Sequence, residues 1–322
     1  MNIVYLLGNG FDINLGMKTR YSDFYINFKE KNSSSDLVKK LQNSISENII
    51  NWSDLELALG EYTSEFNTID EFDEVYECLL NSLCDYIDEE FEKYDFSTLS
   101  ISEFFKNLSV PEKFLAVQDA SEVAEYKSKW KQSQKIINII NFNYTRSVEK
   151  IIEGTKGNHI GTFDNSNYYL DKLIHIHGFT NERTILGVND LSQVSNTNFH
   201  KDSDFTEALI KIESNVRQRH NIDKDCIKLI NSSDIVFIFG CSLGATDKFW
   251  WKLVADNLKR GIKVIIFFRA EVQNQRLGHR PLRIQRMVRK MFWEMSDLSD
   301  EEKDICDKNL YIKINADIFN LF

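Results

Sequence analysis

The chain has 322 residues, of which 42% are hydrophobic and 27% are charged, and its net charge is −10. A chain of this length buries roughly three quarters of the surface that it exposes when unfolded, so it needs no disulfide or metal to hold its core together. The composition excludes a disordered protein. The 5 cysteines include no CxxC pair, which argues against a disulfide scaffold and a tetrathiolate zinc site.

Residues 3–7 (IVYLL) form the first predicted element, a short apolar run that stops at Gly8. This pattern is typical of a strand buried on both faces, as in a parallel sheet. The segment lacks the basic leader and the small-residue cleavage site of a secretion signal. No stretch of the chain approaches the roughly 18 to 20 apolar residues of a membrane span. We therefore expect a cytoplasmic protein that does not enter the membrane.

Residues 21–130 are predicted to be a block of helices, because apolar residues recur there at intervals of three and four, as at Val75, Leu79, Leu83 and Tyr86. Residues 54–95 hold 15 acidic residues and the single basic Lys93, a balance of −14. The rest of the chain carries +4, since −10 minus −14 is +4. We expect the block to be an acidic helical insertion that covers or regulates a crevice in the remainder.

Strands are predicted after this block at 135–144, 172–178, 233–240 and 263–269, with helices at 145–153, 203–219 and 247–259. Apolar strands that alternate with helices indicate an α/β fold with a doubly wound, mostly parallel, Rossmann-like sheet. The predicted domains are a core made of 1–20 plus 131–322 and the insertion at 21–130. The tail at 311–322 fits either an edge strand or a helix.

Small residues follow two of the predicted strands, at the end where open α/β sheets bind ligands. Gly8-Asn9-Gly10-Phe11-Asp12 comes after the first strand, and its glycines would let the backbone approach a phosphate. A purely structural turn explains the same glycines equally well. Gly240-Cys241-Ser242-Leu243-Gly244 forms a second such turn, in which Ser242 is either part of a binding site or a helix cap.

Two other predicted strands end in amide and imidazole side chains. Asn141 and Asn143 lie among isoleucines, where unpaired amides are costly, although asparagines also form turns. His175 and His177 end the strand 172–178, and alternation would place both on one face. A lone strand histidine is more often a hydrogen-bonded core residue, and no second His/Cys cluster supports a metal site. Together, the four strand ends predict a nucleotide crevice.

With these motifs, the chain resembles the AbiH family of bacteriophage abortive-infection proteins, through Gly8–Asp12 and the Tyr-x-Asp-Phe at 21–24. That family is similar to the sirtuins, as a distant branch. The residues that resemble sirtuin motifs, in the same order, are Gly8-Asn9-Gly10, Asp23-Phe24, Asn143, His177-Gly178 and Gly240-Cys241-Ser242-Leu243. The sirtuin zinc module is absent. Thr145 stands where sirtuins have the Asp that contacts nicotinamide, so either Asp12 or Asp23 would take that role or the nicotinamide end would be bound differently.

The resemblance implies a sirtuin-like core that hydrolyses NAD⁺ to ADP-ribose and nicotinamide, and so drains NAD⁺ from an infected cell. NAD⁺ would be the substrate, with no prosthetic group and no metal. The implied catalytic residues are His177 as general base, Asn143 as the residue that holds the ribose or the attacking water, and Asp12 as the stabiliser of the cationic ribose. The implied NAD⁺-binding residues are Gly8, Asn9, Gly10, Phe11, Asp23, Gly240 and Ser242. The alternative is a non-catalytic sensor of ADP-ribose or a signalling nucleotide.

A basic run surrounds a predicted amphipathic helix that starts near Pro281; it consists of Arg276, Arg280, Arg283, Arg286, Arg289 and Lys290. The apolar face of this helix is marked by Ile284, Met287, Val288 and Met291. One interpretation is a solvated helix face. The other is a docking surface for the acidic 54–95 segment of a second copy, which would give a homo-oligomer. A phage trigger or a defence partner protein is a further expected partner, whereas nucleic acid is a lesser expectation.

Overall fold

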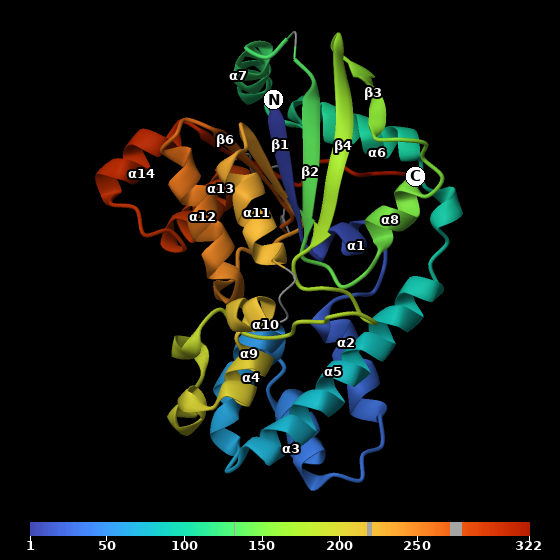
Figure 1. The fold of residues 1–322 in the computed structure, drawn as a ribbon, viewed down its shortest axis with the longest axis vertical. Helices are drawn as coiled ribbons and strands as arrows, with labels where there is room; N and C mark the ends of the chain where they lie inside the picture. Colours follow the sequence, from blue (N-terminus) through green and yellow to red (C-terminus); the bar gives the residue numbers. More distant parts are fainter. Residues whose placement is uncertain (132, 218–220, 271–278) are drawn as a thin grey trace.

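The computed structural model describes residues 1–131, 133–217, 221–270 and 279–322, and its centre is a seven-stranded sheet (Figure 1). The strands are β1 (Asn2–Leu7), β2 (Lys135–Asn141), β3 (His159–Phe163), β4 (Ser166–His175), β5 (Ile235–Phe239), β6 (Lys263–Phe268) and β7 (Leu310–Ile314). β1 consists of buried apolar residues along almost its whole length, as a central strand of a parallel sheet requires.

The strands lie in the order β3-β4-β2-β1-β5-β6-β7, and all neighbours are parallel except β3, which is antiparallel to β4. When only the parallel strands are counted along the chain, their order is 3-2-1-4-5-6. Sheets with this order reverse their winding between the first and fourth strands and bind ligands beyond the carboxyl ends there. The reversal falls between β1 and β5. The predicted α/β fold with a mostly parallel sheet is therefore confirmed.

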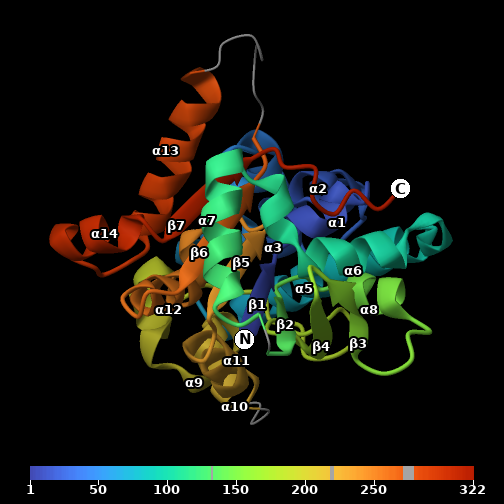
Figure 2. The same ribbon diagram turned by 90° about the horizontal axis from the view of Figure 1, so that it is seen from above.

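Helices cover both faces of the sheet, because alternate residues of a strand point to opposite faces. Ile3 and Tyr5 of β1 belong to a core shared with α1, α6, α7 and α8, whereas Val4 and Leu6 belong to a core shared with α11, α12 and α13. α7 and α11 lie on opposite sides of the sheet when the molecule is seen from above (Figure 2). The covering helices are α1 (Gly10–Asn14), α6 (Ile101–Ser109), α7 (Val117–Ser128), α8 (Ser147–Ile152), α11 (Ile222–Asn231), α12 (Lys248–Leu258), α13 (His279–Glu294) and α14 (Asp300–Asp307).

A further layer of helices, which we call the helical layer, lies beyond the carboxyl ends of the strands, in the lower half of Figure 1. It consists of α2 (Tyr21–Glu30), α3 (Asp36–Glu47), α4 (Leu55–Tyr62), α5 (Ile69–Glu92), α9 (Ser203–Leu209) and α10 (Lys211–Arg217). Its core is distinct from the two cores of the sheet; α2 to α5 contribute residues such as Phe72, and the chain after β4 contributes residues such as Phe205.

The segment 21–130 contains α2 to α7 and no strand, which confirms the prediction of a mainly helical segment. Within it, α2 to α5 build the helical layer, whereas α6 and α7 pack on the sheet. The predicted division into two domains stays a prediction. Across the described residues, no helix combines the length and the apolar character needed to cross a bilayer.

Three predicted elements differ from those in the structure. The strand expected at 172–178 starts at Ser166 and ends at His175, because the chain first forms a hairpin with β3 at the edge of the sheet. The helix expected at 203–219 is broken at Ile210, where the backbone pairs with Val188, so it forms α9 and α10. The undecided tail supplies the edge strand β7.

Candidate functional site

A cavity of about 1380 Å³ lies beyond the carboxyl ends of β1, β2 and β5, and α2 and α4 of the helical layer bound it on the opposite side. The strands end level with one another, because Leu7 pairs with both Asn141 and Phe239. The predicted site residues that line the cavity are Gly8, Asn9, Gly10, Asp12, Asp23, Asn143, His177, Gly240 and Ser242. Phe11 is different: its ring packs in the core against Phe104 and Phe319.

Gly8 and Gly10 pack directly against the turn that follows β5. A Cβ on Gly8 would lie 2.6 Å from the carbonyl oxygen of Gly240, and one on Gly10 would lie 2.5 Å from its Cα, so neither position has room for a side chain. Their amides donate hydrogen bonds to the carbonyl oxygens of Phe239 (2.9 Å) and Gly240 (2.8 Å). The glycines therefore join the two turns at the reversal of the sheet, and these two amides are already occupied by protein acceptors.

Asn9 holds the loop that connects α1 to α2. Its Nδ2 donates to the carbonyl oxygen of Thr19 (2.7 Å), and its Oδ1 accepts from the Thr19 hydroxyl (2.6 Å). Tyr86 of α5 fastens the same loop, because its hydroxyl donates to the carbonyl oxygen of Lys18 (2.8 Å). Asp23 also acts on backbone structure, since its carboxylate accepts from the amide of Arg20 (3.3 Å) at the start of α2.

Three basic side chains line the cavity, and they come from two separate loops. Lys18 and Arg20 belong to the loop held by Asn9, and Arg269 follows β6. All three are exposed, and among the described residues none of them forms an ion pair. Arg269 donates a hydrogen bond to Oδ1 of Asn14 (3.1 Å). Exposed cations without a counter-charge on the wall of a cavity are suited to an anionic ligand.

Buried polar atoms without hydrogen-bond partners gather on the sheet side of the cavity. Within the described part of the chain, they include Oδ1 of Asp12, both amide atoms of Asn143, and Nε2 of His177. These residues are only 1%, 4% and 3% exposed. Leaving one such atom unpaired costs about 1–3 kcal/mol, and native proteins do so rarely. Three of these side chains on one cavity present polar atoms that a bound polar ligand or ordered water would pair.

Asp12 lies in α1 and points toward the loop that follows β2. Its Oδ2 accepts a hydrogen bond from the hydroxyl of Thr145 (2.5 Å), which in turn accepts from Ser147 (3.1 Å). Burial raises the pKa of Asp12 to about 6, although these hydrogen bonds act to lower it. Asp12 therefore holds its ionised form in an environment that disfavours the charge.

His177 lies just beyond the end of β4, and its ring packs edge-on against Phe142 with the centroids 5.4 Å apart. Burial lowers the pKa of His177 below its ordinary value, and the positive charge of Lys211 adds to this effect, so the imidazole is neutral at neutral pH. A neutral imidazole with an unpaired ring nitrogen can accept a proton.

The prediction that both histidines share one face of a strand is wrong, because β4 ends at His175 and the alternation stops there. Nε2 of His175 lies 2.8 Å from Oε1 of Glu149 in α8, and its Nδ1 lies 3.0 Å from the carbonyl oxygen of Asn143. His175 therefore takes its partners from the chain that supports Asn143, whereas His177 lines the cavity.

A buried network of charges, which the sequence does not predict, lies next to His177. Nζ of Lys211 lies 2.7 Å from Oε2 of Glu56 and 2.9 Å from Oδ1 of Asp247, and the same Asp247 oxygen lies 3.3 Å from Nε2 of His177. Glu56 and Lys211 are 155 positions apart in the chain. Asp247 stands at the start of the helix predicted at 247–259, and no local pattern marks the other two. A buried lysine and a buried glutamate are visible only once the fold is known.

Among the described residues there is no cluster of three or more His, Cys, Asp or Glu side chains that could hold a metal ion. The fold and the cavity together define a doubly wound α/β protein with a crevice at the reversal of its sheet, covered by a helical layer.

The particular family follows from a comparison with known protein families. The family described as "Bacteriophage abortive infection AbiH" matches residues 4–268, and the chain belongs to this family. The match covers the sheet from β1 to β6 and the whole helical layer. A search of curated proteins finds no match to the chain.

Proposed function

We propose that the protein is an NAD⁺ glycohydrolase with a sirtuin-like Rossmann core, which acts in abortive infection by draining NAD⁺ from the infected cell. Membership of the AbiH family supports the role in defence. The strand order supports the core, since 3-2-1-4-5-6 is the order of sheets that bind dinucleotides across the reversal point. The cavity at that point is large enough for a dinucleotide, because ligand pockets of about 300–1,000 Å³ hold drug-sized molecules.

The pyrophosphate would be bound by side chains and not by the glycine turn. The amides of Gly8 and Gly10 are already bonded within the protein. Lys18, Arg20 and Arg269 line the same cavity without a carboxylate partner among the described residues. Basic side chains bind phosphates through charge-assisted hydrogen bonds. Asn9 would contribute by holding the loop that carries Lys18 and Arg20.

Hydrolysis would take place beside Asp12, Asn143 and His177. The bond between the ribose anomeric carbon and the nicotinamide nitrogen breaks, and nicotinamide leaves with the bonding electrons through an oxocarbenium-like transition state. The Asp12 carboxylate would stabilise the positive charge on the ribose. Water adds to the anomeric carbon, with Asn143 holding it or a ribose hydroxyl, and His177 takes the proton that the water loses.

The observation that carries this proposal is the convergence of unpaired, buried polar atoms of Asp12, Asn143 and His177 on one cavity. It is tested by incubating the purified protein with NAD⁺ and measuring nicotinamide and ADP-ribose by chromatography, alone and in lysate from phage-infected cells. We expect both products in equal amounts. Binding of NAD⁺ or ADP-ribose without turnover in either condition would contradict the enzyme and favour a nucleotide sensor.

A further inference from the structure

Lys211 is a buried cation that bridges the helical layer and the sheet. It is 4% exposed, and it starts α10. Its two carboxylate partners come from different parts of the fold: Glu56 lies in α4, and Asp247 ends the short 3₁₀ helix that precedes α12. Burial of charged groups is costly unless they are paired, and here one ammonium pairs with two carboxylates. The opposite charges raise the pKa of Lys211 and lower that of Asp247, although burial acts against both.

His177 and Lys211 compete for one oxygen of Asp247. Nε2 of His177 lies 3.3 Å from Oδ1 of Asp247, within the range of an ion pair, yet this nitrogen has no hydrogen bond of acceptable geometry within the described residues. Nζ of Lys211 lies closer to the same oxygen, at 2.9 Å, and is hydrogen-bonded to it. A carboxylate with no other partner would bind a ring N–H of the histidine and favour the imidazolium.

We propose that Lys211 is a positioning residue, which binds the carboxylate of Asp247 and thereby keeps the imidazole of His177 neutral and able to take a proton from the attacking water. The proposal rests on the proposed function, in which His177 is the general base. Glu56 holds Lys211 from the side of the helical layer. The layer therefore does more than cover the crevice, because one of its carboxylates secures the cation that sets the state of His177.

The other groups that face His177 do not replace Lys211. Arg183, which follows β4, acts on His177 in the same direction through its positive charge, but its guanidinium is bonded to Asn215 (2.8 Å) and to the carbonyl oxygen of His175 (2.7 Å). The hydroxyl of Tyr144 donates to the carbonyl oxygen of Ile185 (2.9 Å). Asp247 is therefore the anion next to the ring, and Lys211 is the cation bonded to it.

The test is an NMR titration of the histidine side chains in the intact protein, with His177 assigned by comparison with His177→Gln. We expect Lys211→Met to raise the titration midpoint of His177 by about one pH unit or more, because the freed Asp247 then favours the imidazolium. We expect Asp247→Asn to lower it, since the anion is lost while Lys211 keeps Glu56. This pair of opposite shifts is expected if the Lys211 and Asp247 charges set the state of His177, and a lysine with a merely structural role would give no such pair.

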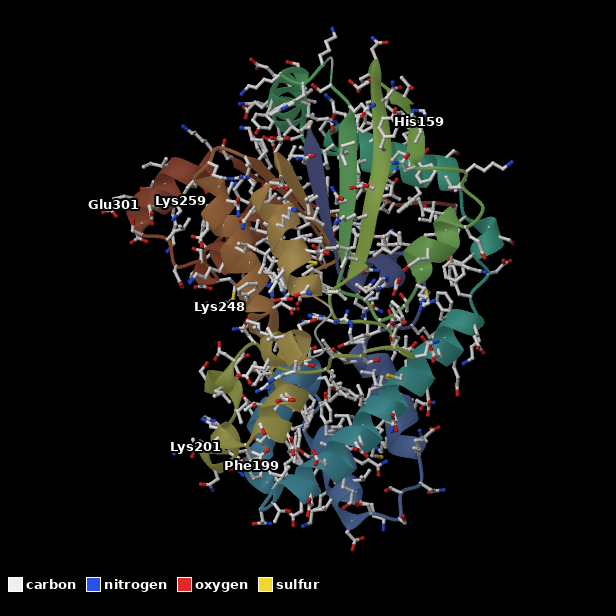
Figure 3. All side chains as sticks on the ribbon, viewed as in Figure 1. His159, Phe199, Lys201, Lys248, Lys259 and Glu301 are labelled. Atoms are coloured by element: carbon white, nitrogen blue, oxygen red, sulfur yellow. The ribbon has the colours of Figure 1, made fainter. Side chains whose placement is uncertain are left out.

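Lys127→Met is the matched control, because Lys127 is also buried in an ion pair, at 2.7 Å from Glu112, outside the cavity. We expect it to reduce stability without moving the His177 midpoint. His159, at the far end of the sheet, serves as the reference resonance and should not shift in any variant (Figure 3). If Lys211→Met does not fold, Glu56→Gln/Lys211→Met replaces it, since this pair removes the second carboxylate together with the lysine.

An unchanged His177 midpoint in the lysine variant, or shifts of the same sign in the lysine and Asp247 variants, would overturn the proposal. The titration needs no NAD⁺, so this failure is distinct from a failure of the proposed enzyme activity. If the wild type does turn over NAD⁺, the acid limb of kcat/KM should move to higher pH in the lysine variant in step with the titration. At a pH well below both midpoints we expect about tenfold lower kcat/KM, which is the effect of a one-unit change in the midpoint.

Discussion

The hydroxyl of Thr145 donates a hydrogen bond of 2.5 Å to Oδ2 of Asp12, so the loop after β2 is joined directly to the first turn after β1. Thr145 is the position where the resemblance places the sirtuin Asp. The carboxylate thus reaches this point from α1, whereas Asp23 uses its carboxylate to cap α2. This contact favours Asp12 over Asp23 as the acid that faces the reacting end of the ligand. Asp12 and Thr145 are therefore neighbours in space, although they are 133 positions apart in the chain.

Asp12→Asn should abolish turnover while it stabilises the protein. Burial raises the pKa of Asp12 to about 6, so keeping the carboxyl ionised at pH 7 costs the folded state on the order of 3 kcal/mol. The folded protein binds a proton at this site more tightly than the unfolded chain, so the free energy of unfolding decreases as pH rises from about 4 to about 6. In the Asn variant this decrease should be smaller, and stability at pH 7 should be higher by about 1–3 kcal/mol.

Chemical denaturation at pH 4, 5, 6 and 7 measures this difference. Glu112→Gln is the control, because the Glu112 carboxylate is buried but paired with Lys127. Its loss should destabilise the protein, since a buried cation is left without its partner. An Asp12→Asn protein that is less stable than the wild type at pH 7 would contradict the inference that burial of the ionised Asp12 carboxylate destabilises the fold.

Arg20→Ala combined with Lys18→Ala should weaken NAD⁺ binding and leave the fold intact, because both side chains are exposed on the cavity wall. Each lost charge-assisted hydrogen bond to a phosphate contributes about 1.5–3 kcal/mol, so we expect at least a tenfold rise in Kd for the pair. Calorimetric titration at low and high salt measures the change. Nicotinamide riboside, which lacks the pyrophosphate, is the control ligand and should bind the variant and the wild type alike. Equal NAD⁺ affinity in the two proteins would show that Lys18 and Arg20 do not bind the phosphates.

The sheet could be predicted from the sequence because its central strands are continuous apolar runs, such as residues 3–7, that are bounded by glycine or polar turns. The ends of these runs also led to Gly8, Asn143, His177 and Gly240 as candidates, since ligand sites follow the ends of parallel strands, and these four residues line the cavity. β3 was not predicted, because this edge strand is largely exposed and carries no apolar run. Glu56 and Lys211 were not predicted because ion pairs between distant segments depend on the tertiary fold, and a single sequence carries no local signal for them.

The predicted homo-oligomer can be tested at the basic face of α13. Arg283 and Arg286 are exposed on this helix, whereas Arg289 pairs with Asp307 and Lys290 with Glu294; Arg276 lies outside the described residues. If this face docks on the acidic α5 of a second copy, light scattering at low salt should give a dimer that dissociates at high salt. Arg283→Glu/Arg286→Glu should give a monomer at both salt concentrations. A wild type that is monomeric at low salt would refute the docking surface and leave a solvated helix face.

His177→Ala should abolish NAD⁺ cleavage while the protein stays folded and still binds nucleotide. The imidazole lies beyond the end of β4, so its loss opens space toward an existing cavity and leaves the sheet intact. The stability cost should be about 1 kcal/mol. A positioned general base contributes about 10²–10⁴-fold in rate, which is the loss that we expect in kcat. Product formation and thermal unfolding of the same samples measure the two effects.

His175→Ala is the informative comparison, because the two rings are two positions apart but have different partners. His175 is bonded to Glu149 and to the carbonyl oxygen of Asn143, so its removal should disturb the loop that carries Asn143 and destabilise the fold more than the loss of His177. Any loss of turnover in His175→Ala should be accompanied by weaker nucleotide binding, because Asn143 loses the support of His175. His177→Ala should lower kcat with Kd nearly unchanged. Wild-type turnover in the His177→Ala variant would show that His177 takes no part in the reaction. If the variant instead lost nucleotide binding, His177 would be a ligand-binding residue and not a general base.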